Sequence, residues 1–267
     1  MKKSFDGFTA YALVFMVFLY APVVLLPLFS FNDNTFAIFP LKGFTLKHYV
    51  AMADNRSMLD ALGNSLMVGV IASVTATALG LVAAITLSRK KLPASNFLLG
   101  TIMLPLIVPS IIFAVAFLVL MVKVLGINLS LWTIMIAHIF LCLPFSVMVL
   151  MARLEGLDRS LEEASYDLGE GSWGTFRRVT LPLVMPAVIS SLLMCFVTSF
   201  DEFVMAFFLS GTQPTLPVFL YGQLRFPNKL PSVLALGSLI LIASTILAVT
   251  AELLRRRGGA QLSATDV

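Results

Sequence analysis

Six apolar runs, each long enough to cross a lipid bilayer, occupy most of this 267-residue chain. A membrane-spanning helix needs about 20 mostly apolar residues, and within lipid the backbone polar groups must be satisfied by helices or closed barrels. The runs are continuous rather than alternating, which excludes a β-barrel. We therefore predict an all-α membrane protein with spans at about 10–31, 64–88, 97–122, 131–152, 183–209 and 232–254.

The composition excludes a soluble protein. Hydrophobic residues make up 59% of the chain and charged residues 12%, with a mean hydropathy of +0.97, whereas soluble domains carry about 25% charged residues. The net charge of +4 does not indicate a nucleic-acid partner, because the basic residues fall in short groups between the apolar runs. Such a distribution is typical of membrane topology, so the lipid bilayer is the expected environment.

One transmembrane domain over residues 1–267 is expected, because no repeat and no linker interrupts the chain. The first apolar run is too long for the core of a signal peptide and has no cleavage motif after it, so we expect it to remain as the first span. The outer loops, at about 32–62 and 210–231, are too short to hold a receptor domain.

Lysine and arginine predict the orientation, because these residues accumulate in cytoplasmic segments. With the N-terminus inside, twelve of the 18 basic residues lie on the inner side. Both termini and the segment 153–182 are then cytoplasmic. The inner basic residues are Lys2, Lys3, Arg89, Lys90, Lys91, Arg153, Arg159, Arg177, Arg178, Arg255, Arg256 and Arg257.

Enzyme chemistry has no visible basis in the sequence. There is no P-loop for ATP and no HExxH or GxSxG motif, so we predict no catalytic residue, metal or cofactor in this chain. Cys142 and Cys195 lack the neighbouring ligands of a metal site and are interpreted as small buried hydrophobes. His138 lies within a span, where a histidine is a functional candidate, but without an acidic partner in that span a packing role is favoured.

A charged segment, residues 160–182, separates the fourth and fifth runs. Ser160 and Glu163 have the spacing of a capping box, and Gly169 suits the left-handed cap that ends a helix. A second short helix is expected from Ser172, and Pro182 suits the first turn of the next span. One apolar stripe is formed by Leu161, Ala164 and Leu168. From spacing alone, a docking surface and a solvated loop with incidental helices remain equally open.

The same segment resembles the EAA loop of the permease subunits of ABC importers. That motif has E-A-A, three residues, G, nine residues and I-x-L-P. The chain has Glu163-Ala164-Ser165, three residues, Gly169, nine residues and Val179-Thr180-Leu181-Pro182, so every spacing matches. Ser165 and Val179 depart from the motif, and both are similar in size to the residues they replace.

The resemblance implies a role for the segment. In this family the loop forms a coupling helix that sits in a groove on a separate ATPase subunit, which binds ATP and Mg²⁺. The residues expected to couple to the ATPase are Glu163, Ala164, Ser165, Gly169, Leu181 and Pro182. Arg177 and Arg178 are expected to meet the ATPase or anionic lipid headgroups.

Nearly the whole chain is similar to permeases of the spermidine/putrescine branch. The similarity is carried by HIFLCLPFSVMVLMARLEGLDRSLEEASYDLG, RRVTLPLVMPAVISS and FVTSFDEFVMAFFLSG. It implies a type I importer fold in a bacterial inner membrane. The implied partners are a second, homologous permease, two ATPase subunits and a periplasmic binding protein.

Two adjacent acids, Asp201 and Glu202, stand where polyamine permeases often carry a pair of acids in the fifth span. They lie about 19 residues beyond Pro182, roughly 28 Å along a helix, which predicts the outer half of the bilayer. Carboxylates there need partners, and a cationic amine in transit would be one. An interfacial pair or a salt bridge to the partner permease is the alternative. Adjacent helical residues lie about 100° apart, so at most one should face the pore.

One position departs from the branch: typical members have Pro-Asp in the third span, and this chain has Pro109-Ser110. The missing carboxylate leaves open another amine-bearing solute, such as an opine, an aminophosphonate or an amino acid. A secondary carrier that acts without an ATPase is a further alternative, with Asp201 and Glu202 as cation sites, but it leaves the pattern of 161–182 unexplained.

Overall fold

The computed structural model describes residues 7–89 and 94–262, with the side chains of the last helix described as far as Ile246. The described residues are almost entirely helical, with an isolated β-bridge between Asn32 and Phe44. Five helices are long and apolar enough to cross a membrane, or six spans when one bent helix pair counts as a span. The chain divides into two compact units, Met1–Met58 with Leu220–Val267, and Leu59–Phe219.

The first unit is built on the last helix, α12 (Leu230–Leu262), which follows the 3₁₀ turn η3 (Pro227–Lys229). Both α1 (Gly7–Ser30) and α2 (Lys47–Ala53) pack against α12. The loop between α1 and α2 is organised by Asn32, whose side-chain oxygen accepts the Lys42 backbone N–H at 2.9 Å. Lys2 and Lys3 of the expected inner face lie outside the described residues, as do Lys90 and Lys91.

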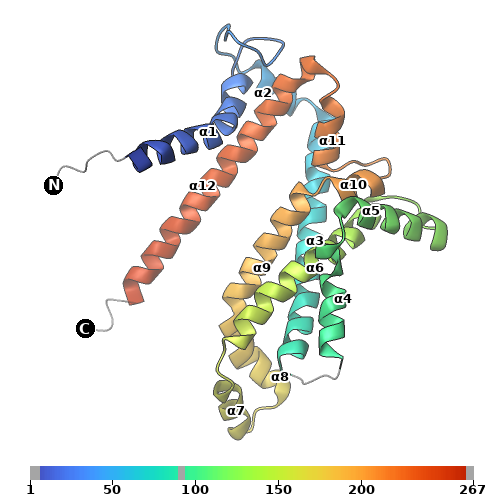
Figure 1. Ribbon diagram of the computed structural model, residues 1–267, viewed down its shortest axis with the longest axis vertical. Coiled ribbons are helices and arrows are strands. Elements are labelled where there is room, and N and C mark those ends of the chain that lie inside the picture. The colour runs from blue at the N-terminus through green and yellow to red at the C-terminus, as the bar shows by residue number, and fades with distance from the viewer. Residues whose placement is uncertain (1–6, 90–93, 263–267) are drawn as a thin grey trace, which may run out of the picture. The chain divides into compact units, whose positions relative to one another are not determined.

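The second unit holds helices α3 to α10 (Figure 1), and its buried apolar residues form several clusters. The expected spans 64–88 and 131–152 correspond to α3 and α6, and α3 begins well before its apolar run. The bounds are α3 (Arg56–Arg89), α4 (Ser95–Ile107), α5 (Ser110–Val119), the π-helical turn η1 (Leu120–Val124), α6 (Leu131–Glu155), α7 (Ser160–Asp167), α8 (Ser172–Thr175), the π-helical turn η2 (Phe176–Thr180), α9 (Leu181–Asp201), α10 (Val204–Leu209) and α11 (Leu216–Gln223).

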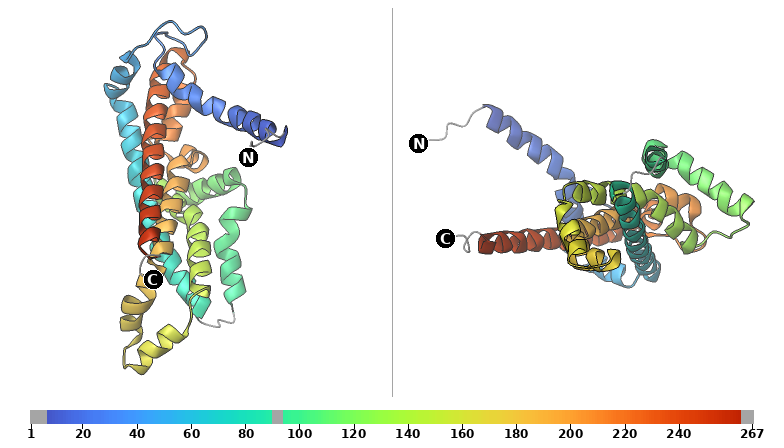
Figure 2. Two further views of the ribbon diagram at one scale, coloured as in Figure 1. Left: turned by 90° about the vertical axis from the view of Figure 1, so that its left-hand side faces the viewer. Right: turned by 90° about the horizontal axis from the view of Figure 1, so that it is seen from below.

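The expected single span 97–122 is instead two helices. The segments Ser95–Ile107 and Ser110–Val124 meet at an angle of 105°, and the turn is visible between α4 and α5 (Figure 1, Figure 2). Val108, at the break, has an extended backbone with ψ of 130°. The residue before a proline is driven towards this conformation by clash with the proline ring, so Pro109 accounts for the break.

The expected fifth span, 183–209, also differs from the structure. A helical stretch begins at Ser172, continues through η2 and α9, and ends at Asp201. Two non-helical residues then precede the short helix α10. The 183–209 run was continuous only in hydropathy, and neither glycine nor proline marks the break in the sequence.

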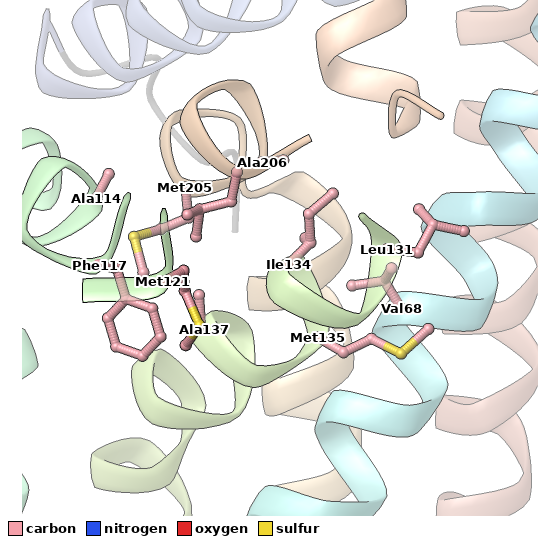
Figure 3. Packing of buried hydrophobic residues seen from close by; sticks show 11 residues of the cluster. Val68, Ala114, Phe117, Met121, Leu131, Ile134, Met135, Ala137, Met205 and Ala206 are labelled. Atoms are coloured by element: carbon pink, nitrogen blue, oxygen red, sulfur yellow. The ribbon is translucent and has the colours of Figure 1, made fainter. Parts of the chain in front are cut away.

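One apolar cluster of this unit lies where α3, α5, α6 and α10 meet. Its buried side chains point towards one another in Figure 3, with Ile134 and Ala137 of α6 between Val68 on one side and Met205 on the other. The short helix α10 therefore completes this cluster with three buried side chains, Met205, Ala206 and Leu209. The cluster comprises Val68, Ala114, Phe117, Met121, Leu131, Ile134, Met135, Ala137, Met205, Ala206 and Leu209.

A ladder of small polar side chains joins α6 to α9 at four-residue spacing. His138 Nδ1 lies 2.8 Å from Ser199 Oγ, and both side chains are buried. The two free cysteines donate to each other's backbone carbonyls, Cys142 to Cys195 at 3.4 Å and Cys195 to Cys142 at 3.5 Å. Both thiols and His138 therefore lie in the helix interface, as the packing interpretation predicts, but the buried His138 Nε2 has no hydrogen-bond partner among the described residues.

The next rung of the ladder brings in α3. Ser191 Oγ donates to Ser146 Oγ at 2.9 Å and lies 3.0 Å from Thr77 Oγ1. On α3, Gly80 lies directly against Ser146, and a Cβ at Gly80 would be 2.7 Å from the Ser146 Cβ. Small residues allow helices in a membrane to approach closely and to share hydrogen bonds. At this level of the bundle, the three helices are thus joined by small residues and shared hydrogen bonds.

Replacement of Gly80 by alanine should therefore separate α3 from α6. We expect Gly80→Ala to destabilise the detergent-solubilised protein by about 1–3 kcal/mol, because overpacking displaces the neighbouring backbone. The measurement is the midpoint of thermal unfolding. Gly63→Ala is the matched control in the same helix, since its added Cβ meets no atom within 4 Å. An equal midpoint for both variants would contradict the close contact.

Candidate functional site

The charged segment forms two short helices at the end of the second unit, where α6 ends and α9 begins (Figure 1). The first, α7, ends at Asp167, and Gly169 follows it as the predicted left-handed cap, with φ of +87°. The Gly169 N–H donates to the Tyr166 carbonyl at 2.9 Å and the Glu170 N–H to the Ser165 carbonyl at 3.1 Å. This pair of bonds is the Schellman motif, so the end of α7 is fixed by backbone geometry.

The predicted capping box at Ser160 and Glu163 is wrong. Ser160 is already the first residue of α7, and no side chain caps the helix from the N-cap position, Arg159. Instead the Ser160 backbone N–H donates to Asp158 Oδ1 at 3.0 Å. Hydrogen bonds from Ser160, chiefly from its backbone N–H, hold the pKa of the Asp158 carboxyl below its usual value. The acid two residues earlier thus takes the role predicted for the serine.

The predicted coupling residues divide into an outer and an inner group. Glu163, Ala164 and Gly169 are exposed, as a docking surface requires. Ser165 is buried, and its hydroxyl lies 3.0 Å from Thr175 Oγ1 of α8. The serine that departs from the motif therefore joins α7 to α8 instead of facing outwards.

Large apolar side chains lie on the outside of the same two helices. Leu168 is 87% exposed and Trp173 is 72% exposed. At the start of α9, Pro182 is exposed and Leu181 is half-buried. Exposed apolar groups of this kind next to polar ones indicate an interaction surface.

Arg178 pairs within the segment. Its guanidinium forms an ion pair with Glu170, and Glu170 also packs against Gly174, where an added Cβ would lie 3.0 Å from the Glu170 Cδ. Arg177 is exposed. Both arginines therefore lie on the outside of the segment, and Arg178, whose side chain is 73% exposed, also has Glu170 as a partner within the loop.

Gly169 and Gly171 give a direct test of the α7 cap. We expect Gly169→Ala to destabilise the end of α7 by about 1–2 kcal/mol, the usual cost of a left-handed backbone for a residue with a Cβ. Hydrogen exchange of the Glu170 amide measures the loss. Gly171→Ala is the control, because Gly171 has φ of −79° and open space around it. Equal protection in both variants would refute a role for the left-handed conformation.

The acid pair lies at the break between α9 and α10. Asp201 is the last residue of α9 and is exposed. Glu202 is half-buried in a non-helical backbone, with φ of −71° and ψ of 113°, and its Oε1 accepts the Met205 N–H at 3.1 Å. The expectation that a helical step of about 100° separates the two side chains is therefore wrong, because Glu202 is not part of a helix.

The two carboxylates consequently have different surroundings. Glu202 satisfies a free backbone N–H in the first turn of α10, whereas Asp201 has no hydrogen-bond or ionic partner within the described part of the chain. No sequence signal predicted this division, since glutamate is not a favoured capping residue. Among the described residues, no group of three or more His, Cys, Asp or Glu could hold a metal ion.

The chain belongs to the family described as the binding-protein-dependent transport system inner membrane component, whose model matches residues 76–258. This match includes the α7–α8 segment and the acid pair. The chain is thus a multi-pass member of an inner-membrane permease family.

Two curated relatives cover nearly the whole chain. It is 34% identical over 240 residues to the spermidine/putrescine transport system permease protein PotC of Escherichia coli K12, covering 90% of each chain. It is also 34% identical over 251 residues to the putrescine transport system permease protein PotI of the same strain, covering 91% of this chain and 89% of the relative.

Solved structures with low sequence identity share the fold. A bacterial ABC transporter involved in the import of the acidic polysaccharide alginate contains a chain with a TM-score of 0.70 and 16% identity, covering 94% of this chain and 97% of that chain. A chain of the inward-facing MetNI methionine ABC transporter has a TM-score of 0.58 and 17% identity, covering 79% and 98%. The predicted fold class, an ABC importer permease, is confirmed.

Proposed function

We propose that this chain is the permease subunit of an ATP-driven importer for a small cationic amine, with spermidine or putrescine as the solute. The observation that carries the proposal is the exposed Asp201 carboxylate at the end of a membrane helix, in a chain whose relatives of 34% identity are named as polyamine permeases. A charge in that position favours a cation. Residues 1–267 act as one permease domain in this proposal, with both termini in the cytoplasm.

Asp201 is the carboxylate assigned to the solute. α9 runs 21 residues from Leu181, so Asp201 lies about 30 Å from the helix start. An exposed carboxylate at that depth is costly against lipid, and it would face the pore or a partner permease. A passing ammonium group offers it charge-assisted hydrogen bonds. Glu202 serves the backbone of α10 and shapes the break beside the path.

The α7–α8 segment is the proposed contact with the ATPase. Ala164 leaves space for a close approach, and Glu163 presents a carboxylate that can accept hydrogen bonds from the partner. Leu168 and Trp173 supply apolar area beside them. The Schellman cap and the Ser165–Thr175 bond keep the two helices in a fixed relation, so that displacement of the segment would move it as one piece.

The proposed complete transporter has further subunits. A second homologous permease would supply the other half of the pore, two ATPase subunits would bind and hydrolyse ATP with Mg²⁺, and a periplasmic binding protein would deliver the solute. In this arrangement the present chain has no catalytic role.

The docking surface can be tested by copurification with the ATPase subunit. We expect Ala164→Arg, alone or with Glu163→Ala, to reduce recovery of the ATPase at least about tenfold, because a bulky charged side chain would lie in the interface without a partner. Glu155→Ala is the matched control, an exposed acid at the end of α6. If the ATPase still copurifies and couples hydrolysis to uptake, the docking assignment fails.

The two acids can be separated by uptake kinetics. We expect Asp201→Asn to raise the KM for spermidine or putrescine about tenfold or more, since hydrogen bonds to charged groups contribute roughly 1.5–3 kcal/mol. Glu202→Gln should change KM less, because its amide oxygen can still accept the Met205 N–H. An amino acid and an opine are assayed in parallel. Unchanged uptake of every solute in the Asp201 variant would exclude a role in the pathway.

A further inference from the structure

Adjacent acids in the first turn of α7 point to opposite sides. Glu163 is exposed, whereas the Glu162 side chain is 19% exposed and faces the ends of neighbouring helices. Glu162 Oε1 accepts hydrogen bonds from Arg89 Nη2 of α3 and from Thr180 Oγ1 of η2, each at 2.9 Å. One carboxylate oxygen thus joins α7 to the last residue of α3 and to the start of α9.

A second bond runs in the opposite direction between the same two helices. Arg159, at the N-cap of α7, donates from Nη2 to the Ser88 carbonyl at 2.9 Å. The last carbonyls of a helix lack partners within it, and a cation there is favoured by the helix dipole. Two hydrogen bonds from different donors therefore hold α3 and α7 together, and bending between the two helices would break at least one of them.

The Arg89–Glu162 pair is shielded from water, with the two side chains only 16% and 19% exposed. Exposed ion pairs contribute little because water screens them, whereas loss of one partner from a shielded pair leaves an uncompensated charge. The loop also contains a contrasting ion pair, Glu170–Arg178. Its arginine side chain is 73% exposed, and both residues lie within the segment 160–182, so this pair makes no connection to a helix outside that segment.

Two further hydrogen bonds attach α3 to the chain in its N-terminal half. Asn64 Nδ2 donates to the Pro214 carbonyl at 3.0 Å, and the Ser65 hydroxyl accepts the Leu216 N–H at 2.8 Å. Residues 210–216 follow α10, which itself follows the break at Asp201 and Glu202. About 36 Å of helix separates Ser65 from Arg89, so α3 joins the α7 segment to this loop.

We infer that Arg89 is a positioning residue that, through Glu162, makes α3 a lever from the docking segment to the loop 210–216. This inference rests on the proposed function, since α7 must be displaced by an ATPase for the lever to move. α9 receives the same displacement directly through the chain. The ion pair connects α3 to α7 as well, so that α3 and α9 both move with α7.

The lever is tested in the reconstituted complex of both permeases, the ATPase subunits and the binding protein. The variants are Arg89→Met, Glu162→Gln and the charge swap Arg89→Glu with Glu162→Arg, and the matched control is Glu170→Gln. Copurification of the ATPase, ATP hydrolysis and solute imported per ATP are measured for each. A Thr212→Cys background reports on the exposed loop through nucleotide-dependent labelling with an impermeant maleimide; the native thiols are buried.

We expect both single variants to keep the ATPase and its hydrolysis while solute imported per ATP falls about tenfold, within the usual range of coupling between sites. The nucleotide-dependent change in labelling should disappear with it. The charge swap should restore both quantities, and the Glu170 control should alter neither. A merely structural ion pair would not move the labelling response in a complex that still binds and hydrolyses ATP.

Three results would overturn the lever. They are unchanged solute per ATP in Arg89→Met, loss of coupling in the Glu170 control as well, and loss of the ATPase in Arg89→Met that the charge swap does not restore. Failure of the proposed function is distinguishable: the wild-type chain would then retain no ATPase, or Ala164→Arg would retain it fully, whatever the Arg89 variants do.

Discussion

Close contact between α6 and α9 is the constraint on which the second unit depends. Lipid tails are as apolar as leucine, so helices in a bilayer associate through packing and shared hydrogen bonds rather than through removal of apolar surface from water. The pairs His138–Ser199 and Cys142–Cys195 place small polar groups between the two helices at each turn. Ser191 extends the series to α3, so three spans share one interface.

Irregular backbone interrupts two of the predicted spans outside this interface. The α4–α5 bend at Pro109 and the break after Asp201 both interrupt spans, and non-helical backbone at membrane depth is tolerated only where protein or a water-filled cavity covers it. At the second break Glu202 supplies an acceptor for a free N–H. The same irregularity leaves Asp201 as an exposed residue at the end of α9, two residues beyond Ser199 of the ladder.

Acids that are neighbours in the sequence have different surroundings in the structure. Glu163 faces outwards to the proposed docking surface, while Glu162 faces inwards to Arg89 and Thr180. Asp201 and Glu202 divide in the same way, one to the exterior and one to the backbone. In each pair, one acid is hydrogen-bonded to other groups of the chain and the other is exposed, so equal charge in the sequence conceals unequal surroundings.

Hydropathy determined the membrane class and the positions of most spans, because continuous apolar runs have no other stable structure in lipid. Motif spacing located the α7–α8 segment, and Gly169 could be predicted as its cap since few residues adopt that backbone. The angle at Pro109, the end of α9 at Asp201 and the inward direction of Ser165 were decided by tertiary structure. Pro109 accounts locally for the first break, but the directions taken after it depend on tertiary packing. The helix after Asp201 packs on α5 and α6, and Ser165 turns towards Thr175 of α8. A single chain's sequence does not record which of these groups meet.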